Sequence, residues 1–174
     1  EKVLQMSMFD RQKATFKLAE VDANSAIYNI VNTFKLKVEK YGGHITASLD
    51  ALDAIVNVDE MHFTNVIFNL LDNAVKYRDP DRPLELTVSS RDLPDRRLRI
   101  EIADNGIGIR KDDVKRIFQK FYRVNTGNRH DVKGFGLGLA YVKKIIEEFQ
   151  GRISVESELG RGTKFIITLP LIDE

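Results

Sequence analysis

The stretch LELTVSSRDLPDRRLRIEIAD, from Leu84 to Asp104, decides the fold class of this chain. It holds two runs of alternating apolar and polar residues, LELTVSS and RLRIEIAD, which are typical of β-strands. The residues between them, RDLPD, are typical of a turn, so the stretch predicts a β-hairpin. Helical patterns precede and follow it in separate blocks. Because hairpins rather than helices join most of the strands, we predict an α+β fold in which helices cover one face of a sheet.

The composition limits the class of protein. With 174 residues, the chain is long enough for one ordinary domain. A formal net charge of +1 creates no strong field that would attract nucleic acid, so we expect no nucleic-acid partner. The absence of Cys excludes disulfides and thiolate metal sites and agrees with a reducing compartment. No apolar run approaches the roughly 20 residues of a membrane span. Because the chain does not begin with Met, we expect it to be a piece of a longer protein.

Further elements surround the hairpin. Before it, KLAEVD, HITASL and AIVNV predict short strands, and two helices follow N-caps at Asp22 or Asn24 and at Asp59. After it, RKDDVKRIFQKFY is helical at first, and a helix of about fourteen residues ends at Gly151. RISVESE and GTKFIITLPL then close the chain as a second hairpin.

The helix MHFTNVIFNLLDNAVKY carries two asparagines off its apolar stripe. At about 100° per residue, Asn69 and Asn73 lie one turn apart on one face, and Lys76 and Tyr77 extend the same side. Asn is a poor residue for the interior of a helix, so the pair indicates a use for its amide oxygens. Hard cations such as Mg²⁺ accept oxygen ligands of this kind, together with water and substrate phosphates. The alternative is a solvated polar face.

The segment DNGIG begins at Asp104, where the second strand of the hairpin ends. DNG is common in hairpin turns, and that is the simpler interpretation. However, the helical pattern RKDDVKRIF follows, so the strand ends in a loop that contains Gly106 and Gly108. A carboxylate at the rim of this loop can accept a hydrogen bond from an exocyclic amine such as that of adenine.

Three glycines, Gly134, Gly136 and Gly138, precede an amphipathic helix in KGFGLGLAYVKKI. Their spacing matches neither G-x-x-x-x-G-K-[ST] nor G-x-G-x-x-G, so it predicts neither a P-loop nor a dinucleotide fold. A helix beginning near Phe135 or Gly136 has unpaired N–H groups and the positive end of its dipole in the first turn. Glycines there have no Cβ and would let phosphate oxygens approach the backbone. Tight helix packing is the alternative.

Five segments together resemble the nucleotide-binding boxes of sensor histidine kinases, in the same order. They are NLLDNAVKY, DNGIGI, IFQKFYR, GFGLGLAYVKKI and GTKFIITLPL, and the resemblance extends from Leu18 to Leu171. It implies an ATP-binding catalytic domain with a Bergerat-type fold, a two-layer α/β sandwich. In that fold a mixed, mostly antiparallel sheet is covered on one face by helices. The resemblance also implies that residues 18–174 form this domain and that residues 1–17 are the end of a dimerisation helix.

The resemblance implies roles for individual residues. Asn73 matches the Mg²⁺ ligand, Asn69 would be a second polar contact, and Lys76 and Tyr77 would lie near the phosphates or the base. Asp104 matches the carboxylate that reads adenine. The other residues implied to bind ATP or to shape its pocket are Gly106, Gly108, Phe118, Phe121, Lys133, Gly134, Gly136, Leu137, Gly138 and Thr163.

Several of these residues surround an implied lid over about residues 123–134. Phe118 and Phe121 would pack beside it, and the glycines after it would form a hinge and a phosphate-facing helix start. Arg129 and Lys133 within it would neutralise phosphate charge, although such residues are often simply solvated. Thr163 would lie near the adenine.

The histidines do not match the phosphoacceptor of a sensor kinase, which lies in a helix beside an acidic residue. His44 precedes a strand, His62 lies in the asparagine helix, and His130 lies in the lid. We therefore expect the chain to bind ATP and Mg²⁺ and to donate the γ-phosphoryl group to a His on a dimerisation domain outside it. The expected partners are that domain and the receiver domain of a response regulator. We expect the isolated domain to be a monomer. We expect the full protein to be a membrane-anchored receptor, with this domain in the cytoplasm.

Other functions remain open at this stage. ATP hydrolases of the same fold carry a glutamate one turn before the metal asparagine, as general base for water. Asn69 stands at that position, which favours phosphoryl transfer to an imidazole. A glycine-loop anti-sigma kinase is a nearer relative, but the KFYR segment and the opening helix favour a sensor kinase. The last alternative is a nucleotide-free interaction module, which an ATP titration would distinguish.

Overall fold

The computed structural model describes residues 16–119, 122 and 138–172. The lid expected over residues 123–134, and all but Phe16 and Lys17 of the expected remnant helix, lie outside these residues. In chain order the elements are β1 (Leu18–Asp22), α2 (Ala23–Glu39), β2 (His44–Leu49), β3 (Ile55–Asp59), α3 (Glu60–Lys76), β4 (Glu85–Leu93), β5 (Arg97–Asp104), α4 (Lys111–Val114), α5 (Gly138–Glu148), β6 (Arg152–Glu158) and β7 (Gly162–Pro170).

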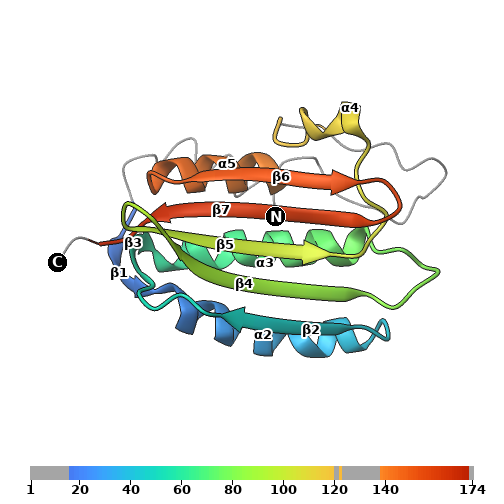
Figure 1. Ribbon diagram of the computed structural model, residues 1–174, viewed down its shortest axis with the longest axis horizontal. Helices are drawn as coiled ribbons and strands as arrows, with labels where there is room; N and C mark the ends of the chain where they lie inside the picture. The colour runs from blue at the N-terminus through green and yellow to red at the C-terminus, as the bar shows by residue number, and fades with distance from the viewer. Residues whose placement is uncertain (1–15, 120–121, 123–137, 173–174) are drawn as a thin grey trace.

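The main sheet has five strands in the order β2-β4-β5-β7-β6. Only β2 and β4 pair in parallel, and the other neighbours are antiparallel. A separate two-stranded antiparallel sheet joins β1 and β3. Figure 1 shows α2, α3 and α5 lying behind the five-stranded sheet, all on one face. The α+β fold and the mixed, mostly antiparallel sheet are therefore confirmed.

The core lies between the sheet and these helices. Along β5, the alternating residues Leu98, Ile100 and Ile102 are all buried, as their period of two predicts. The helix α3 buries the stripe that its period of about 3.6 defines. Its buried residues are Phe63, Val66, Ile67, Leu70, Leu71, Ala74 and Val75. The apolar face of α3 is thereby fixed on the sheet, which directs its polar residues elsewhere.

The predicted turn of the hairpin was wrong in position. The strand β4 continues to Leu93, which pairs with Arg97, so the turn covers residues 94–96 and not RDLPD. Asp95 and Arg96 have φ angles of 65° and 54°, in the left-handed region. Pro94 lacks an N–H and cannot continue the ladder, and Asp tolerates left-handed φ better than most residues. The reversal therefore takes place after the proline.

The helix caps follow the expected chemistry. The Asp22 side chain accepts a hydrogen bond from Ser25 N–H (3.3 Å), so Asp22 rather than Asn24 caps α2. Asn24 instead donates to the carbonyl of Ala51 (3.0 Å). Asp59 caps α3 by accepting from His62 N–H (3.1 Å). These caps fix the first turn of each helix.

Candidate functional site

The two asparagines of α3 lie half-buried beside the apolar stripe. The Asn69 side chain donates to the carbonyl of Asn65 (2.7 Å), one turn earlier in the same helix. This bond occupies an amide N–H and leaves the side-chain oxygen of Asn69 free to accept. In the described part of the chain, no hydrogen bond to the side chain of Asn73 is present. Both amide oxygens are thus available to a ligand on this face.

Lys76, at the end of α3, is held by an acidic neighbour. Its Nζ lies 3.5 Å from Asp72 Oδ2, and Lys37 of α2 lies 2.7 Å from the other oxygen of the same carboxylate. Asp72 therefore bridges α2 and α3. Because the Lys76 pair is long and partly exposed, its strength is small, and a phosphate could compete for the ammonium group.

The main chain of Tyr77 joins α3 to the loop that follows β5. Its carbonyl accepts a hydrogen bond from Ile107 N–H (3.0 Å). A Cβ on Gly106 would lie 2.4 Å from this carbonyl oxygen, closer than any side chain allows. Gly106 is therefore required for the loop to reach the end of the helix.

Asp104, at the end of β5, has a half-buried side chain. Its Oδ1 accepts a hydrogen bond from Gly106 N–H (2.8 Å), and the backbone of Thr163 supplies a second hydrogen bond. Burial raises the pKa of Asp104 from 3.8 to about 6, and the two backbone hydrogen bonds partly oppose this rise. At neutral pH the group is thus mostly an ionised acceptor that is partly removed from water.

Two further glycines hold this loop against the turn between β6 and β7. Gly108 has a φ of 77°, and a Cβ there would lie 2.2 Å from the carbonyl oxygen of Glu158. Gly162 has a φ of 134°, and a Cβ there would lie 2.0 Å from the carbonyl oxygen of Asp104. The close approach of three backbone segments around Asp104 therefore depends on glycines.

Thr163 lies opposite Asp104 in the register of β5 and β7, and it is buried. Its hydroxyl is 2.8 Å from Ser157 Oγ. Ser157 Oγ also accepts from Ile109 N–H (2.7 Å) and donates to the carbonyl of Gly162 (2.9 Å). Ser157, which the sequence analysis missed, thus links the loop after β5 to both strands of the closing hairpin.

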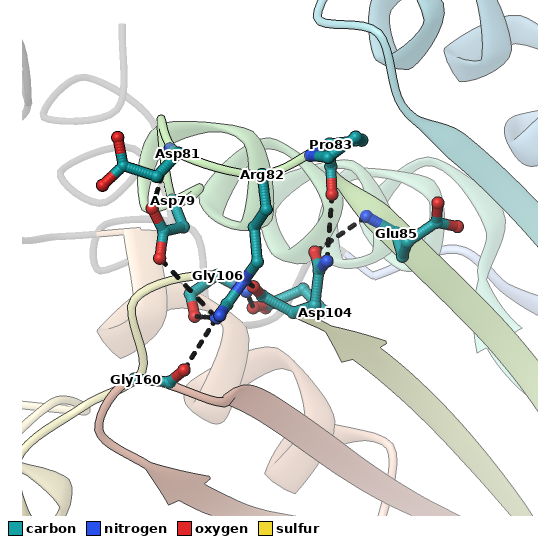
Figure 2. Close-up of polar contacts among 9 residues, drawn as sticks. Asp79, Asp81, Arg82, Pro83, Glu85, Asp104, Gly106 and Gly160 are labelled. Atoms are coloured by element: carbon teal, nitrogen blue, oxygen red, sulfur yellow. Dashed lines mark hydrogen bonds and ion pairs between the residues drawn. The ribbon is translucent and has the colours of Figure 1, made fainter.

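Arg82 is the second residue that the sequence analysis missed, since RDPDRP predicted only a loop. Its Nε donates to the carbonyl of Asn105 (2.8 Å), and its Nη2 donates to the carbonyls of Gly106 and Gly160 (both 2.9 Å). Figure 2 shows the guanidinium reaching across from its own loop to Gly106 and Gly160. No local pattern could have identified this role, because the three partners are distant in sequence.

The expected aromatic and glycine boxes are described only in part. Among the described residues between Arg110 and Gly138, only α4 is an α-helix. Phe118 lies beyond it, edge-to-face with Phe165 of β7 at 6.3 Å between ring centroids. Gly138 is the first described residue of α5. Outside the described residues are Phe121, Arg129, Lys133, Gly134, Gly136 and Leu137.

Within residues 16–119, 122 and 138–172, no three His, Asp or Glu side chains gather as metal ligands. Over the same ranges, no helix has the length and apolarity that a bilayer crossing requires.

Comparisons with known proteins identify the family. Residues 58–173 match the family described as histidine kinase-, DNA gyrase B-, and HSP90-like ATPase. The chain is 63% identical over 172 residues to the sensor protein RprX of Bacteroides fragilis. This match covers 99% of this chain and 33% of RprX. It is 34% identical over 168 residues to the sensor protein kinase WalK of Staphylococcus saprophyticus, covering 97% of this chain and 27% of WalK. The chain thus spans about a third or less of the length of these relatives.

Solved structures have the same fold. The catalytic domain of the histidine kinase ThkA superimposes with a TM-score of 0.75 at 26% identity, covering 89% of this chain and 96% of that one. Full-length ShkA, solved in complex with AMPPNP, gives a TM-score of 0.85 at 24% identity, covering 99% of this chain and 35% of ShkA. Because the family model matches more than half of its residues, the chain belongs to the histidine kinase-, DNA gyrase B-, and HSP90-like ATPase family.

Proposed function

We propose that this chain is the ATP-binding catalytic domain of a sensor histidine kinase. It would bind Mg²⁺ and ATP and donate the γ-phosphoryl group to a histidine on a dimerisation domain. Residues 18–174 would form the catalytic domain, and residues 1–17 would belong to the end of the dimerisation helix. The names of the relatives at 63% and 34% identity, a sensor protein and a sensor protein kinase, support this assignment.

The environment of Asp104 carries the proposal. This carboxyl group is half-buried, it is oriented by Gly106 N–H and the backbone of Thr163, and its partial burial raises its pKa to about 6. A partly desolvated carboxylate of this kind gains from a further N–H donor, and the exocyclic amine of adenine is such a donor. The glycine-dependent contacts around it leave the backbone close to any planar base that enters. These residues therefore fit an adenine nucleotide.

Asn73 and Asn69 would act on the phosphate side. The free oxygen of the Asn73 amide suits a hard cation, and the oxygen of Asn69 lies one turn away. When bound, Mg²⁺ would neutralise phosphate charge. Lys76 would bind a phosphate oxygen after leaving Asp72, and Tyr77 would border the base. The lid residues Arg129, Lys133 and Gly134 would complete the site, together with Gly136, Leu137, Gly138, Phe118, Phe121 and Thr163.

The chemistry at Asn69 favours transfer to an imidazole over hydrolysis. An amide cannot accept a proton as a general base, and the Asn69 amide is also bonded to its own helix. Attack by water therefore receives no help from this position. An imidazole nitrogen is nucleophilic when neutral and needs little such help, so positioning and charge neutralisation carry phosphoryl transfer.

The partners follow from this function and are also proposals. The dimerisation domain would supply the accepting histidine, and the receiver domain of a response regulator would take the phosphoryl group from it. The domain would act in the cytoplasm as part of a membrane-anchored receptor, and it would be a monomer when separated from its dimerisation helices.

Calorimetric titration of this chain with ATP, in Mg²⁺ and in EDTA, tests the proposal. We expect binding that depends on Mg²⁺, little steady hydrolysis, and phosphorylation of an added dimerisation domain that contains its histidine. No detectable ATP binding would contradict the proposal and leave an interaction module. Steady hydrolysis by the isolated chain would instead favour an ATPase.

A further inference from the structure

Arg82 connects three segments that are distant in sequence. Its own loop lies between α3 and β4, Asn105 and Gly106 follow β5, and Gly160 lies in the turn between β6 and β7. The guanidinium can make all three bonds because its donors form a planar fork. The side chain is 36% exposed, and its Nη2 also lies 3.8 Å from Asp79 Oδ2. Arg82 is thus held from its own loop while it holds the other two.

The contacts of Gly106 lead directly from Arg82 to Asp104. The Gly106 carbonyl accepts from Arg82, and the Gly106 N–H donates to Asp104 Oδ1 (2.8 Å). One glycine residue therefore lies between the guanidinium and the carboxylate that is proposed to read the base. Glycine has the freest backbone of all residues, so it keeps one orientation only when its neighbours fix it. Arg82 fixes the carbonyls on both sides of this N–H, those of Asn105 and Gly106.

The side chain of Asn105 makes the connection between the same two loops more rigid. Its Oδ1 accepts from Glu85 N–H (2.8 Å), and its Nδ2 donates to the carbonyl of Pro83 (2.9 Å). Both bonds are drawn in Figure 2 beside those of Arg82. They place the residues after Arg82 against the start of the loop that follows Asp104. The guanidinium therefore acts on a loop whose first residue is already anchored.

We propose that Arg82 is a positioning residue that orients the Asp104 carboxylate toward the amino group of adenine and thereby sets the preference for adenine nucleotides. This inference rests on the proposed function, because it assumes that Asp104 reads the base. Arg82 would touch neither the nucleotide nor the metal. It acts through Gly106, so its loss weakens recognition of the amino group and leaves recognition of the triphosphate unchanged.

The test compares two nucleotides in this 174-residue chain. One is ATP, and the other is purine riboside 5′-triphosphate, which is ATP without its amino group. We expect wild type to prefer ATP by about tenfold or more, the usual effect of one hydrogen bond to a charged group. In Arg82→Met the preference should fall to about twofold or less, with affinity for the purine nucleotide within about twofold of wild type. Arg82→Lys should lose most of the preference, because an ammonium lacks the planar fork.

Arg161→Met is the matched control. Arg161 lies in the same turn as Gly160, and its substitution removes the same positive charge as that of Arg82. Its side chain is 79% exposed, however, and its ion pair with Glu158 is long (3.5 Å). It should keep the wild-type preference. Circular dichroism and thermal melting establish that each variant is folded, and Arg82→Lys decides the question if Arg82→Met does not fold.

The double variant with Asp104→Ala, which removes the acceptor, shows whether Arg82 acts through Asp104. Asp104→Ala alone should abolish the preference, and adding Arg82→Met should change it no further. An unchanged preference in both Arg82 variants would overturn the inference, as would an additional loss in the double variant. If wild type binds neither nucleotide, the proposed function itself fails. If wild type prefers ATP and the Arg82 variants keep that preference, the inference about Arg82 fails while the proposed function stands.

Discussion

The carbonyl of Tyr77 accepts a hydrogen bond from the N–H of Ile107 at 3.0 Å. Tyr77 is the C-cap of α3, the helix that carries Asn69 and Asn73, and Ile107 lies three residues after Asp104. This single main-chain bond thus joins the side proposed to bind the metal and phosphates to the side proposed to bind the base. The separation between the two sides depends on it.

Gly106→Ala should disturb this junction. The new Cβ would lie 2.4 Å from the Tyr77 carbonyl oxygen and 2.9 Å from Asp104 Oδ1, so the loop must shift. We expect a loss of about 1–3 kcal/mol in the free energy of unfolding, measured in urea, and weaker ATP binding. Gly42→Ala is the control, because Gly42 has open space around it and a φ of 71°, so it reports backbone strain alone. Wild-type stability and affinity in Gly106→Ala would show that the junction is more adaptable than described.

The preference for ATP over purine riboside triphosphate should depend on pH. Burial raises the pKa of Asp104 to about 6, and the ionised carboxylate is the better acceptor for the adenine amine. The preference should therefore be complete above about pH 7 and decline as the pH falls through 6. Both nucleotides carry the same phosphates, so the ratio of their dissociation constants cancels phosphate protonation. A ratio that stays constant from pH 5 to 8 in wild type would argue against Asp104, and Asp104→Asn should give such a ratio.

Stability should respond to pH in the opposite sense. The pKa of Asp104 rises from 3.8 to about 6 on folding, so the folded state holds this proton more tightly. Below about pH 4, Asp104 does not lower the free energy of unfolding. Its destabilising contribution grows between pH 4 and about pH 6 and is constant at higher pH. The unfolding free energy of Asp104→Asn relative to wild type should rise between pH 4 and pH 7, by at most about 3 kcal/mol. A difference that is independent of pH would contradict the burial of a titrating carboxyl group.

Asn73→Ala should remove the effect of Mg²⁺ on ATP binding. We expect affinity at least tenfold weaker than wild type in Mg²⁺ and similar to wild type in EDTA, because the variant lacks the proposed metal ligand. The free energy of unfolding should change little, since Asn73 lies off the buried stripe of α3. Asn32→Ala, at an exposed position of α2, should match wild type in both measurements. Asn73→Ala with full Mg²⁺ dependence would remove this residue from the site.

Ser157→Ala should destabilise the closing hairpin. Ser157 Oγ bonds Ile109 N–H and the Gly162 carbonyl, and the variant leaves both without this partner. We expect a loss of about 1–3 kcal/mol in the free energy of unfolding, measured in urea. Ser154→Ala, on an exposed position of the same strand, should lose much less. Equal losses in the two variants would indicate that only strand propensity matters.

The elements that the sequence predicted correctly are those with a repeating burial pattern. Leu98, Ile100 and Ile102 occupy every second position, and the apolar residues of α3 repeat at helical spacing. These two periods predict which side of each element is buried. The hairpin turn was placed too early because Arg91 and Asp92 are polar and precede Pro94, which suggests a turn, yet residues 91–93 pair in the ladder. Its position depends on the backbone of Asp95 and Arg96, which no periodicity records.

The candidate site was predictable only where a residue's chemistry is unusual for its place. Asn69 and Asn73 inside a helix, and Asp104 between a strand and glycines, are of this kind. Arg82 and Ser157 are ordinary loop and strand residues, and their partners lie in other segments brought close only by the fold. The roles assigned to Asn73, Asp104 and the lid residues remain predictions.

The parallel pairing of β2 with β4 affects how the site opens. A hairpin cannot connect parallel neighbours, so the chain must cross the sheet between them, and α3 lies on that crossing. The helix bearing Asn69 and Asn73 therefore cannot detach alone without leaving this strand pair unsupported. The amide protons of α3 should therefore exchange with deuterium as slowly as those of the central strands, because both exchange only when the whole domain opens. The face of α3 that is proposed to bind the metal would then persist as long as the native state does.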